Sequence, residues 1–211
     1  EGIHLQIEDR GMEVRGELRF GAFSGLKYDI MGPFAYLPRM ECRHSVYSMR
    51  HRVKGELHIG SRMMHFNEGL GYMEGDSGMS FPRQYVWTQH FLGEGSLMLA
   101  AATIPFPGFS FTGTVGSLLW KGREYRFATY LGASVKMTAD GIHVRQRGYE
   151  LKAKRLDIEA RLLRAPQEGE MSRMIGENLS CKAEYQLSHK GKLLFCHETD
   201  RAAFEYEAHK L

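Results

Sequence analysis

The stretch that decides the fold is Ile3-His4-Leu5-Gln6-Ile7-Glu8-Asp9-Arg10-Gly11, followed by Met12-Glu13-Val14-Arg15-Gly16-Glu17-Leu18-Arg19-Phe20. Apolar and polar residues alternate in both parts, and Asp9-Arg10-Gly11 separates them with a turn sequence. A period of two over about five to nine residues places successive side chains on opposite faces, as in half-buried antiparallel strands. The stretch therefore predicts two strands joined by a turn.

The same alternation recurs in Gly55 to Ile59, Tyr125 to Tyr130, Ile142 to Gln146 and Leu151 to Leu163. About a dozen such segments follow one another along the chain, with one plausible helical turn near Met171 to Ile175. Strands this numerous usually close into a barrel or a sandwich, because closure removes exposed edges. We therefore predict an all-β fold of antiparallel, barrel-forming strands.

The composition is that of an ordinary globular protein. The chain has 211 residues, of which 43% are apolar and 25% charged, and it contains 24 glycines and only 6 prolines. The net charge of +3 is small, and basic residues alternate with acidic ones, as in Arg15-Gly16-Glu17-Leu18-Arg19. A nucleic-acid partner is therefore not expected.

The cysteines and the longest apolar runs bear on location. The three cysteines, Cys42, Cys181 and Cys196, are odd in number and widely spaced, so a disulfide framework is not expected. We expect a reducing, cytoplasmic location instead. No apolar run reaches the roughly 18 residues of a membrane span. A transient contact with a membrane surface and the oligomeric state are left open.

Leu92-Gly93-Glu94-Gly95 separates two strand-rich halves. We predict that residues 1–91 are part of a first β-barrel and that residues 92–211 form a second. The first half is short and starts inside a strand. We therefore expect the first barrel to be incomplete in this chain and to be completed by residues upstream of Glu1 or by a partner.

Residues Met31 to His51 form the first stretch that is rich in candidate functional groups. Glu41, His44 and His51 bring together a carboxylate and two imidazoles, which can exchange protons or hold a metal. On a regular strand Glu41 and His51 share one face and His44 lies on the other. A purely structural role for each histidine is the alternative. Tyr36, in the same aromatic stretch, is expected to contact substrate.

The second stretch runs from Gly69 to Phe91. Glu74 and Asp76 fall on the same side of an extended segment, and Tyr85, Trp87 and Gln89 then alternate on one face of a strand. Aromatic side chains with one amide among them suit a mostly apolar pocket with a few polar groups. The alternative is a core strand anchored by Trp87.

Several pieces of the sequence resemble the tocopherol cyclase-like family. The matching pieces are Gly32-Pro33-Phe34, Met40-Glu41-Cys42 with His44, Ser48-Met49 with His51, Gly71-Tyr72-Met73-Glu74 with Asp76, Ser80-Phe81-Pro82, Trp87 with Gln89, Ile104-Pro105, Phe111-Thr112-Gly113, Tyr125-Arg126-Phe127-Ala128-Thr129-Tyr130 and Ala165-Pro166 with Gly169 and Met171. The family's string Glu-Lys-Asp-Trp-Gly reads Glu74-Gly75-Asp76-Ser77-Gly78 here. The N-terminal region, where a Glu-Gly-Trp-Tyr motif is expected, has no counterpart.

The resemblance implies two lipocalin-like barrels, similar to those of carotenoid-hydrating enzymes, and a prenylated or other lipid-like ligand. It implies acid-catalysed closure of a prenyl hydroquinone ring, an isomerase reaction, with Glu41, His44, His51, Glu74 and Asp76 as catalytic candidates. No cofactor and no metal are expected. We predict that at least one of Glu41, Glu74 and Asp76 is buried, as a proton donor in an apolar site requires.

Two other functions are open at this point. The first is a non-catalytic carrier of a hydrophobic small molecule, because barrels of this kind can simply enclose a ligand. The second is a metal-dependent enzyme that uses Glu41, His44 and His51.

Overall fold

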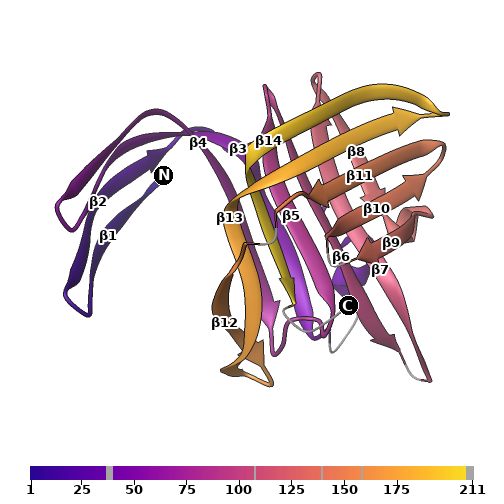
Figure 1. Cartoon of the computed structure of the whole chain (residues 1–211), viewed down its shortest axis with the longest axis horizontal. Helices are drawn as coiled ribbons and strands as arrows, with labels where there is room; N and C mark the ends of the chain where they lie inside the picture. The colour runs from indigo at the N-terminus through magenta and orange to yellow at the C-terminus, as the bar shows by residue number, and fades with distance from the viewer. Residues whose placement is uncertain (37–39, 107, 139, 158, 208–211) are drawn as a thin grey trace. The chain divides into compact units, whose positions relative to one another are not determined.

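The computed structural model of the chain describes residues 1–36, 40–106, 108–138, 140–157 and 159–207 (Figure 1). These residues form strands β1 to β14 and two short turns of 3-10 helix, η1 (Gly32–Tyr36) and η2 (Thr129–Leu131). The strand pairs of the described residues are antiparallel. The predicted all-β, antiparallel fold is therefore confirmed.

Contacts divide the chain into two compact units. Unit 1 comprises Glu1–Lys27 and Val46–Gly75, and unit 2 comprises Tyr28–Ser45 and Asp76–Leu211. Strands β3 (Cys42–Ile59) and β4 (Arg62–Gly78) contribute to both units. The predicted boundary near residue 91 lies at the turn between β5 (Tyr85–Leu92) and β6 (Gly95–Phe106), which pair as a hairpin. The compact units thus have bounds other than 1–91 and 92–211.

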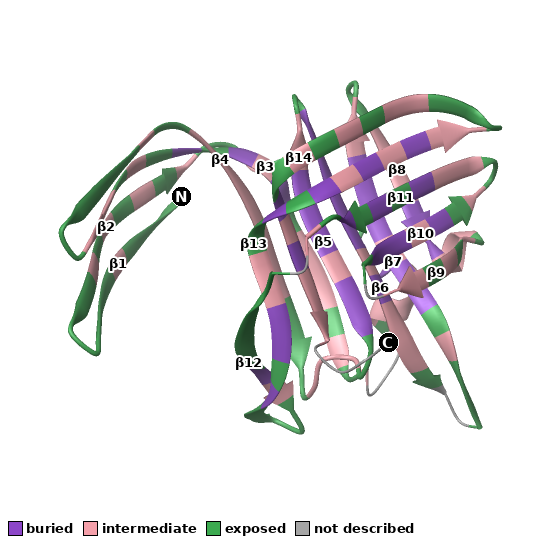
Figure 2. Cartoon of the chain, in the orientation of Figure 1, coloured by how far each residue is buried: buried purple, intermediate pink, exposed green. Residues whose placement is uncertain are grey.

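Unit 1 is built on a four-stranded sheet in the order β1-β2-β3-β4, with β1 at Gly2–Asp9 and β2 at Met12–Phe20. These first two strands are the two halves of the stretch that opened the sequence analysis, and Ile7 pairs with Val14. Arg10 and Gly11 both have positive φ, 48° and 80°, which gives the mirror-image turn whose twist matches a hairpin. No residue of β1 or β2 is buried, as Figure 2 shows.

Unit 2 contains β5, β6 and the later strands. These are β7 (Phe109–Trp120), β8 (Arg123–Ala128), β9 (Ser134–Thr138), β10 (Gly141–Gln146), β11 (Tyr149–Arg155), β12 (Arg161–Gln167), β13 (Glu170–His189) and β14 (Lys192–Glu207). The sheet order is β8-β7-β6-β5-β14-β13-β11-β10-β9, and β12 pairs with β13. The last strand of the chain, β14, pairs with β5, and this pairing places Glu205 opposite Trp87.

The core of unit 2 is filled by side chains from most of these strands. Its largest fully buried members include Tyr185, Phe127 and Phe204, and leucines such as Leu118 and Leu187 pack with them. Figure 2 shows the buried positions along β5 to β7 and across β10, β11 and β13.

Two hydroxyl groups meet inside this core. Thr88 donates to the carbonyl oxygen of Ala203 at 2.8 Å. Because a hydroxyl has a single proton, the Tyr185 hydroxyl must be the donor in its 2.7 Å hydrogen bond with Thr88 Oγ1. Burial raises the pKa of Tyr185 well above its ordinary value, so the phenol stays protonated.

Two histidines extend the same core network. His90 Nδ1 lies 3.3 Å from the carbonyl oxygen of Arg201, which can only accept, so Nδ1 carries the proton. His90 Nε2 then accepts from His197 Nε2 at 3.1 Å. Burial and the neighbouring His197 lower the pKa of His90, which favours its neutral form.

The helical turn predicted near Met171 to Ile175 is wrong, because these residues lie in β13 and pair with β12 and β14. Glu168 and Gly169, with φ of 53° and 86°, form the turn that starts this strand. The predicted run Leu151 to Leu163 is likewise divided, since β11 ends at Arg155 and β12 begins at Arg161.

Candidate functional site

The start of β3 and the end of β4 bring together three polar side chains of unit 2. His44 Nδ1 donates to Asp76 Oδ1 at 2.9 Å, and Cys42 Sγ lies 3.5 Å from the same oxygen. The His44 side chain is only 12% exposed, whereas that of Asp76 is 31% exposed. The structure thus pairs two of the predicted catalytic residues, with the carboxyl group at the edge of solvent.

Cys42 is not a nucleophile in this arrangement. Burial, then the negative charge and hydrogen bond of Asp76, raise the pKa of its thiol to about 12. Because the thiolate is the reactive form of cysteine, a thiol that stays protonated serves as a hydrogen-bond donor. Cys42 and His44 therefore both donate to Asp76.

A second group lies on one face of β5 and β14, which we call the β5–β14 face and define by Tyr85, Trp87, Gln89 and Glu205. The side chains of Tyr85, Trp87 and Gln89 alternate along β5 as predicted, and Glu205 is the cross-strand partner of Trp87. The Tyr85 hydroxyl donates a short hydrogen bond to Glu205. Burial first, and the charge of Glu205 second, raise the pKa of Tyr85, so its phenol remains protonated.

Arg173, on β13, fixes the segment that leads into this face. It donates to the carbonyl oxygens of Phe81 at 2.9 Å and Arg83 at 2.6 Å, and forms a 2.6 Å ion pair with Glu207. Both charged side chains are almost fully buried. Phe81 in turn packs edge-on against Tyr85, with ring centroids 5.8 Å apart. Arg173 therefore orders one end of the β5–β14 face.

The two groups are electrostatic neighbours within unit 2. The charge of Glu205 contributes to the raised pKa of Cys42, and the charge of Asp76 contributes to the raised pKa of Tyr85. Asp76 and Glu205 therefore each act electrostatically on a residue of the other group.

His51 and Glu74 belong to unit 1, where their contacts are of a structural kind. His51 is buried and packs against the rings of Phe20 and Phe23. Its Nδ1 forms a 3.0 Å hydrogen bond with Ser48 Oγ. Burial lowers its pKa and favours the neutral ring. Glu74 accepts a 2.5 Å hydrogen bond from Tyr72. Catalytic roles for these two residues stay predictions.

The expectation that a predicted carboxyl group is buried is wrong. Glu41 and Asp76 are exposed and Glu74 is intermediate. Glu41 precedes β3, and its backbone carbonyl, not its side chain, accepts from Met79 and Ser80. Tyr36 is 88% exposed at the end of η1, so its predicted contact with substrate also stays a prediction.

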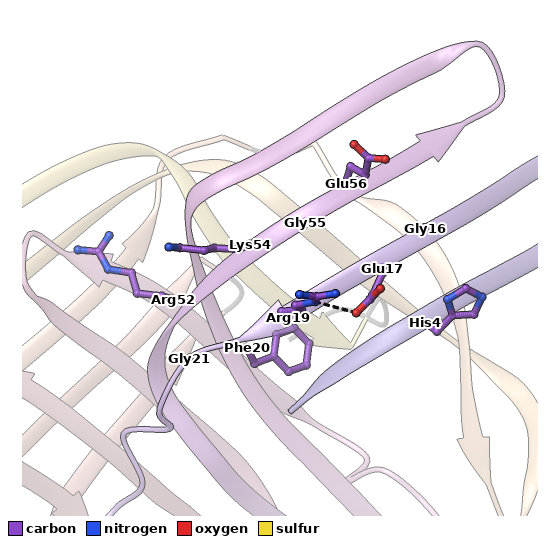
Figure 3. A pocket seen from close by; sticks show the side chains of 10 residues that line it. All are labelled: His4, Gly16, Glu17, Arg19, Phe20, Gly21, Arg52, Lys54, Gly55 and Glu56. Atoms are coloured by element: carbon purple, nitrogen blue, oxygen red, sulfur yellow. Dashed lines mark hydrogen bonds and ion pairs between the residues drawn. The ribbon is translucent and has the colours of Figure 1, made fainter.

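One concavity lies in unit 1 and has a volume of about 850 Å³. Figure 3 shows its lining on the sheet, with Arg19, Arg52 and Lys54 among the projecting side chains and Arg19 bonded to Glu17 at 2.9 Å. Charged side chains project along this concavity, and none of the predicted site residues lines it.

Within the described part of the chain, no group of three or more histidine, cysteine, aspartate or glutamate side chains is placed to hold a metal ion. The alternative of a metal site at Glu41, His44 and His51 has no ligand set there. None of the helical turns in the described ranges is long and apolar enough to cross a membrane. The cytoplasmic location stays a prediction.

Sequence reasoning did not propose Glu205, Arg173 or a role for Cys42. The alternation in Phe204-Glu205-Tyr206-Glu207 is itself a strand signal that places both carboxylates on one face. What the sequence could not supply is the partner of that strand, which lies more than a hundred positions earlier at Tyr85.

Comparisons with known proteins bear on the fold. No known family model matches the sequence, and no curated protein matches it. The chain is similar to the crystal structure of kievitone hydratase from Nectria haematococca, with a TM-score of 0.55 and 8% identity. The match covers 98% of this chain and 65% of that protein. At this identity the likeness shows a lipocalin-like β fold, whereas membership of the tocopherol cyclase-like family stays a prediction.

Proposed function

We propose that this protein is an enzyme that adds a hydroxyl group across a carbon–carbon double bond of a hydrophobic substrate. The observation that carries the proposal is the arrangement at Asp76. His44 and Cys42 both donate to Oδ1, which leaves Oδ2 as the oxygen that can exchange a proton with a substrate.

The reaction starts when protonated Asp76 transfers its proton from Oδ2 to an alkene carbon. The π electrons form the new C–H bond, and a tertiary carbocation remains. The ring of Trp87 offers a π face that attracts a cation. The oxygen of a hydroxyl group then donates a lone pair to the cation and loses its proton.

The source of that hydroxyl group separates two related activities. Water gives a tertiary alcohol, as in a hydratase, and this agrees with the name of the similar structure, kievitone hydratase. A phenol of the substrate itself gives a ring, as in the cyclase reaction implied by the family resemblance. Both activities share the protonation by Asp76.

The test uses ortho-prenylphenol in deuterated water and, separately, in water enriched in heavy oxygen. In deuterated water either activity places one deuterium on carbon. In water enriched in heavy oxygen, hydration adds heavy oxygen, whereas cyclisation gives a chroman with the mass of the substrate. Asp76→Asn should lower the rate at least about a hundredfold, the usual contribution of a positioned acid. The exposed Asp200→Asn variant is the matched control.

A non-catalytic carrier gives a different result. It would bind ortho-prenylphenol, seen as a change in tryptophan fluorescence, with no deuterium in the recovered molecule. Binding without isotope incorporation, or an Asp76→Asn variant as active as the unmodified protein, would contradict the enzymatic proposal.

A further inference from the structure

Three alanines lie beside the residues of the β5–β14 face, together with Met98, which pairs with Gln89. Tyr85 and Trp87 lie opposite Ala102 and Ala100 of β6, and Gln89 lies opposite Ala203 of β14. Methyl groups thus lie beside large aromatic side chains, and Trp87 and Ala102 pack against a small apolar cluster of Tyr85, Ala165 and Ile175, a setting that suits contact with an apolar molecule. Recognition of such a molecule also needs a polar group that the protein does not use for itself.

Gln89 supplies that group. The residue is only 8% exposed, and its Nε2 is buried with no hydrogen-bond partner in the described part of the chain. A buried amide donor without a partner destabilises the folded state, and such groups are uncommon in folded proteins. An oxygen atom of a bound molecule would satisfy it.

Glu205 lies within reach of the same oxygen. Because Gln89 pairs with Ala203 and Trp87 pairs with Glu205, Gln89 and Glu205 are diagonal neighbours on one face. Diagonal positions of an antiparallel pair lie roughly 7–8 Å apart, a span that two long side chains close from both ends around one hydroxyl group. The hydrogen bond from Tyr85 holds the Glu205 carboxylate in place.

We infer that Gln89 and Glu205 hold the hydroxyl group that adds to the alkene, an inference that rests on the proposed function. The Gln89 amide donates to the hydroxyl oxygen, and the Glu205 carboxylate takes its proton as the C–O bond forms. Asp76 thus gives one proton to carbon, and Glu205 receives one proton from the hydroxyl group. Exchange with solvent then protonates Asp76 again and deprotonates Glu205. Glu205 is the catalytic base, and Tyr85 is a positioning residue.

The experiment combines the isotope assay with a stability measurement. With ortho-prenylphenol in deuterated water, Glu205→Gln should lower product formation about a hundredfold, the usual effect of losing a general base. Protonation by Asp76 continues in this variant, and the carbocation loses a proton from a neighbouring carbon. The recovered phenol should therefore contain deuterium. The exposed Glu198→Gln variant of the same strand is the control.

Gln89→Met keeps the size of the side chain and removes the donor. We expect product formation to fall about tenfold, the loss of one hydrogen bond to substrate, while the urea midpoint stays the same or rises. Gln186→Met, which loses a partly buried hydrogen bond to Glu184, is the matched control for product formation.

Three results bear on the inference separately from the proposed function. A lower urea midpoint with unchanged product formation in Gln89→Met would mean that Gln89 is structural, and the inference fails. Full product formation in Glu205→Gln overturns the role of the base while leaving Asp76 as the acid. Absence of deuterium with the unmodified protein refutes the proposed function, and with it the role of Glu205.

Discussion

The hydrogen bonds of Thr88 give the sharpest stability prediction. Thr88 accepts from the fully buried Tyr185 at 2.7 Å and donates to Ala203 at 2.8 Å. Thr88→Val keeps the shape of the side chain but leaves the Tyr185 hydroxyl without an acceptor. We therefore expect the variant to lose about 2 kcal/mol of the free energy of unfolding, the desolvation cost of an unpaired buried donor.

The effect of Tyr185→Phe on the free energy of unfolding should depend on whether Thr88→Val is already present. Tyr185→Phe alone removes the donor and leaves Thr88 with its bond to Ala203, so it should cost only about 1 kcal/mol. In the Thr88→Val background the hydroxyl is already unpaired, and its removal should cost nothing or restore stability. The coupling energy of the pair is then about 1 kcal/mol or more, as for other residues in direct contact.

Urea unfolding followed by tryptophan fluorescence measures these changes in unit 2, because both tryptophans of the chain, Trp87 and Trp120, lie there. The dependence of the free energy on urea should stay constant among the variants, so that the midpoints report stability alone. Thr103→Val, whose hydroxyl bonds to Gln84 at the surface, is the control. An equal cost of Tyr185→Phe in both backgrounds would refute the assigned direction of the hydrogen bonds.

Three further predictions concern unit 2. Because the pKa of His90 is lowered in the folded protein, the unfolded chain binds the proton more tightly. The contribution of neutral His90 to stability is therefore complete above about pH 6.5 and declines as the pH falls below that value. A urea midpoint that stays unchanged between pH 8 and pH 5.5 would contradict this prediction. Gly32→Ala should destabilise by about 1–3 kcal/mol because the new Cβ would lie 2.5 Å from the Tyr130 ring, whereas Gly122→Ala, at a similarly positive φ with open space around it, should cost less in the same urea assay. Iodoacetamide should label the exposed Cys196 well before Cys42, whose pKa is raised to about 12, and equal labelling rates in peptide mass spectrometry would contradict the protonated thiol.

The strands could be predicted from the sequence because alternation with a period of two is a local property. The β1–β2 hairpin follows directly from Ile3 to Phe20, including its turn at Arg10 and Gly11. The error at Met171 to Ile175 has a physical reason as well. This segment has weak alternation, and its extended form comes from pairing with β12 and β14, which a local pattern does not contain.

The candidate site could be predicted only in part, for the same reason. His44 and Asp76 were both singled out as candidates, and the structure joins them. Glu205 was not, because its proximity to Tyr85 depends on a strand pairing across 120 positions. The alternation along β5 correctly placed Tyr85, Trp87 and Gln89 on one face, yet it could not show what lies beside them.

The two faces of strand β5, which has eight residues, have different roles. Val86, Thr88 and His90 face the packed core, where a change of volume or hydrogen bonding alters folding. Tyr85, Trp87 and Gln89 lie on the opposite face, beside alanines of β6 and β14 and beside Glu205. The side chains that we propose to meet a substrate can therefore be exchanged while the alternate positions keep the strand in register.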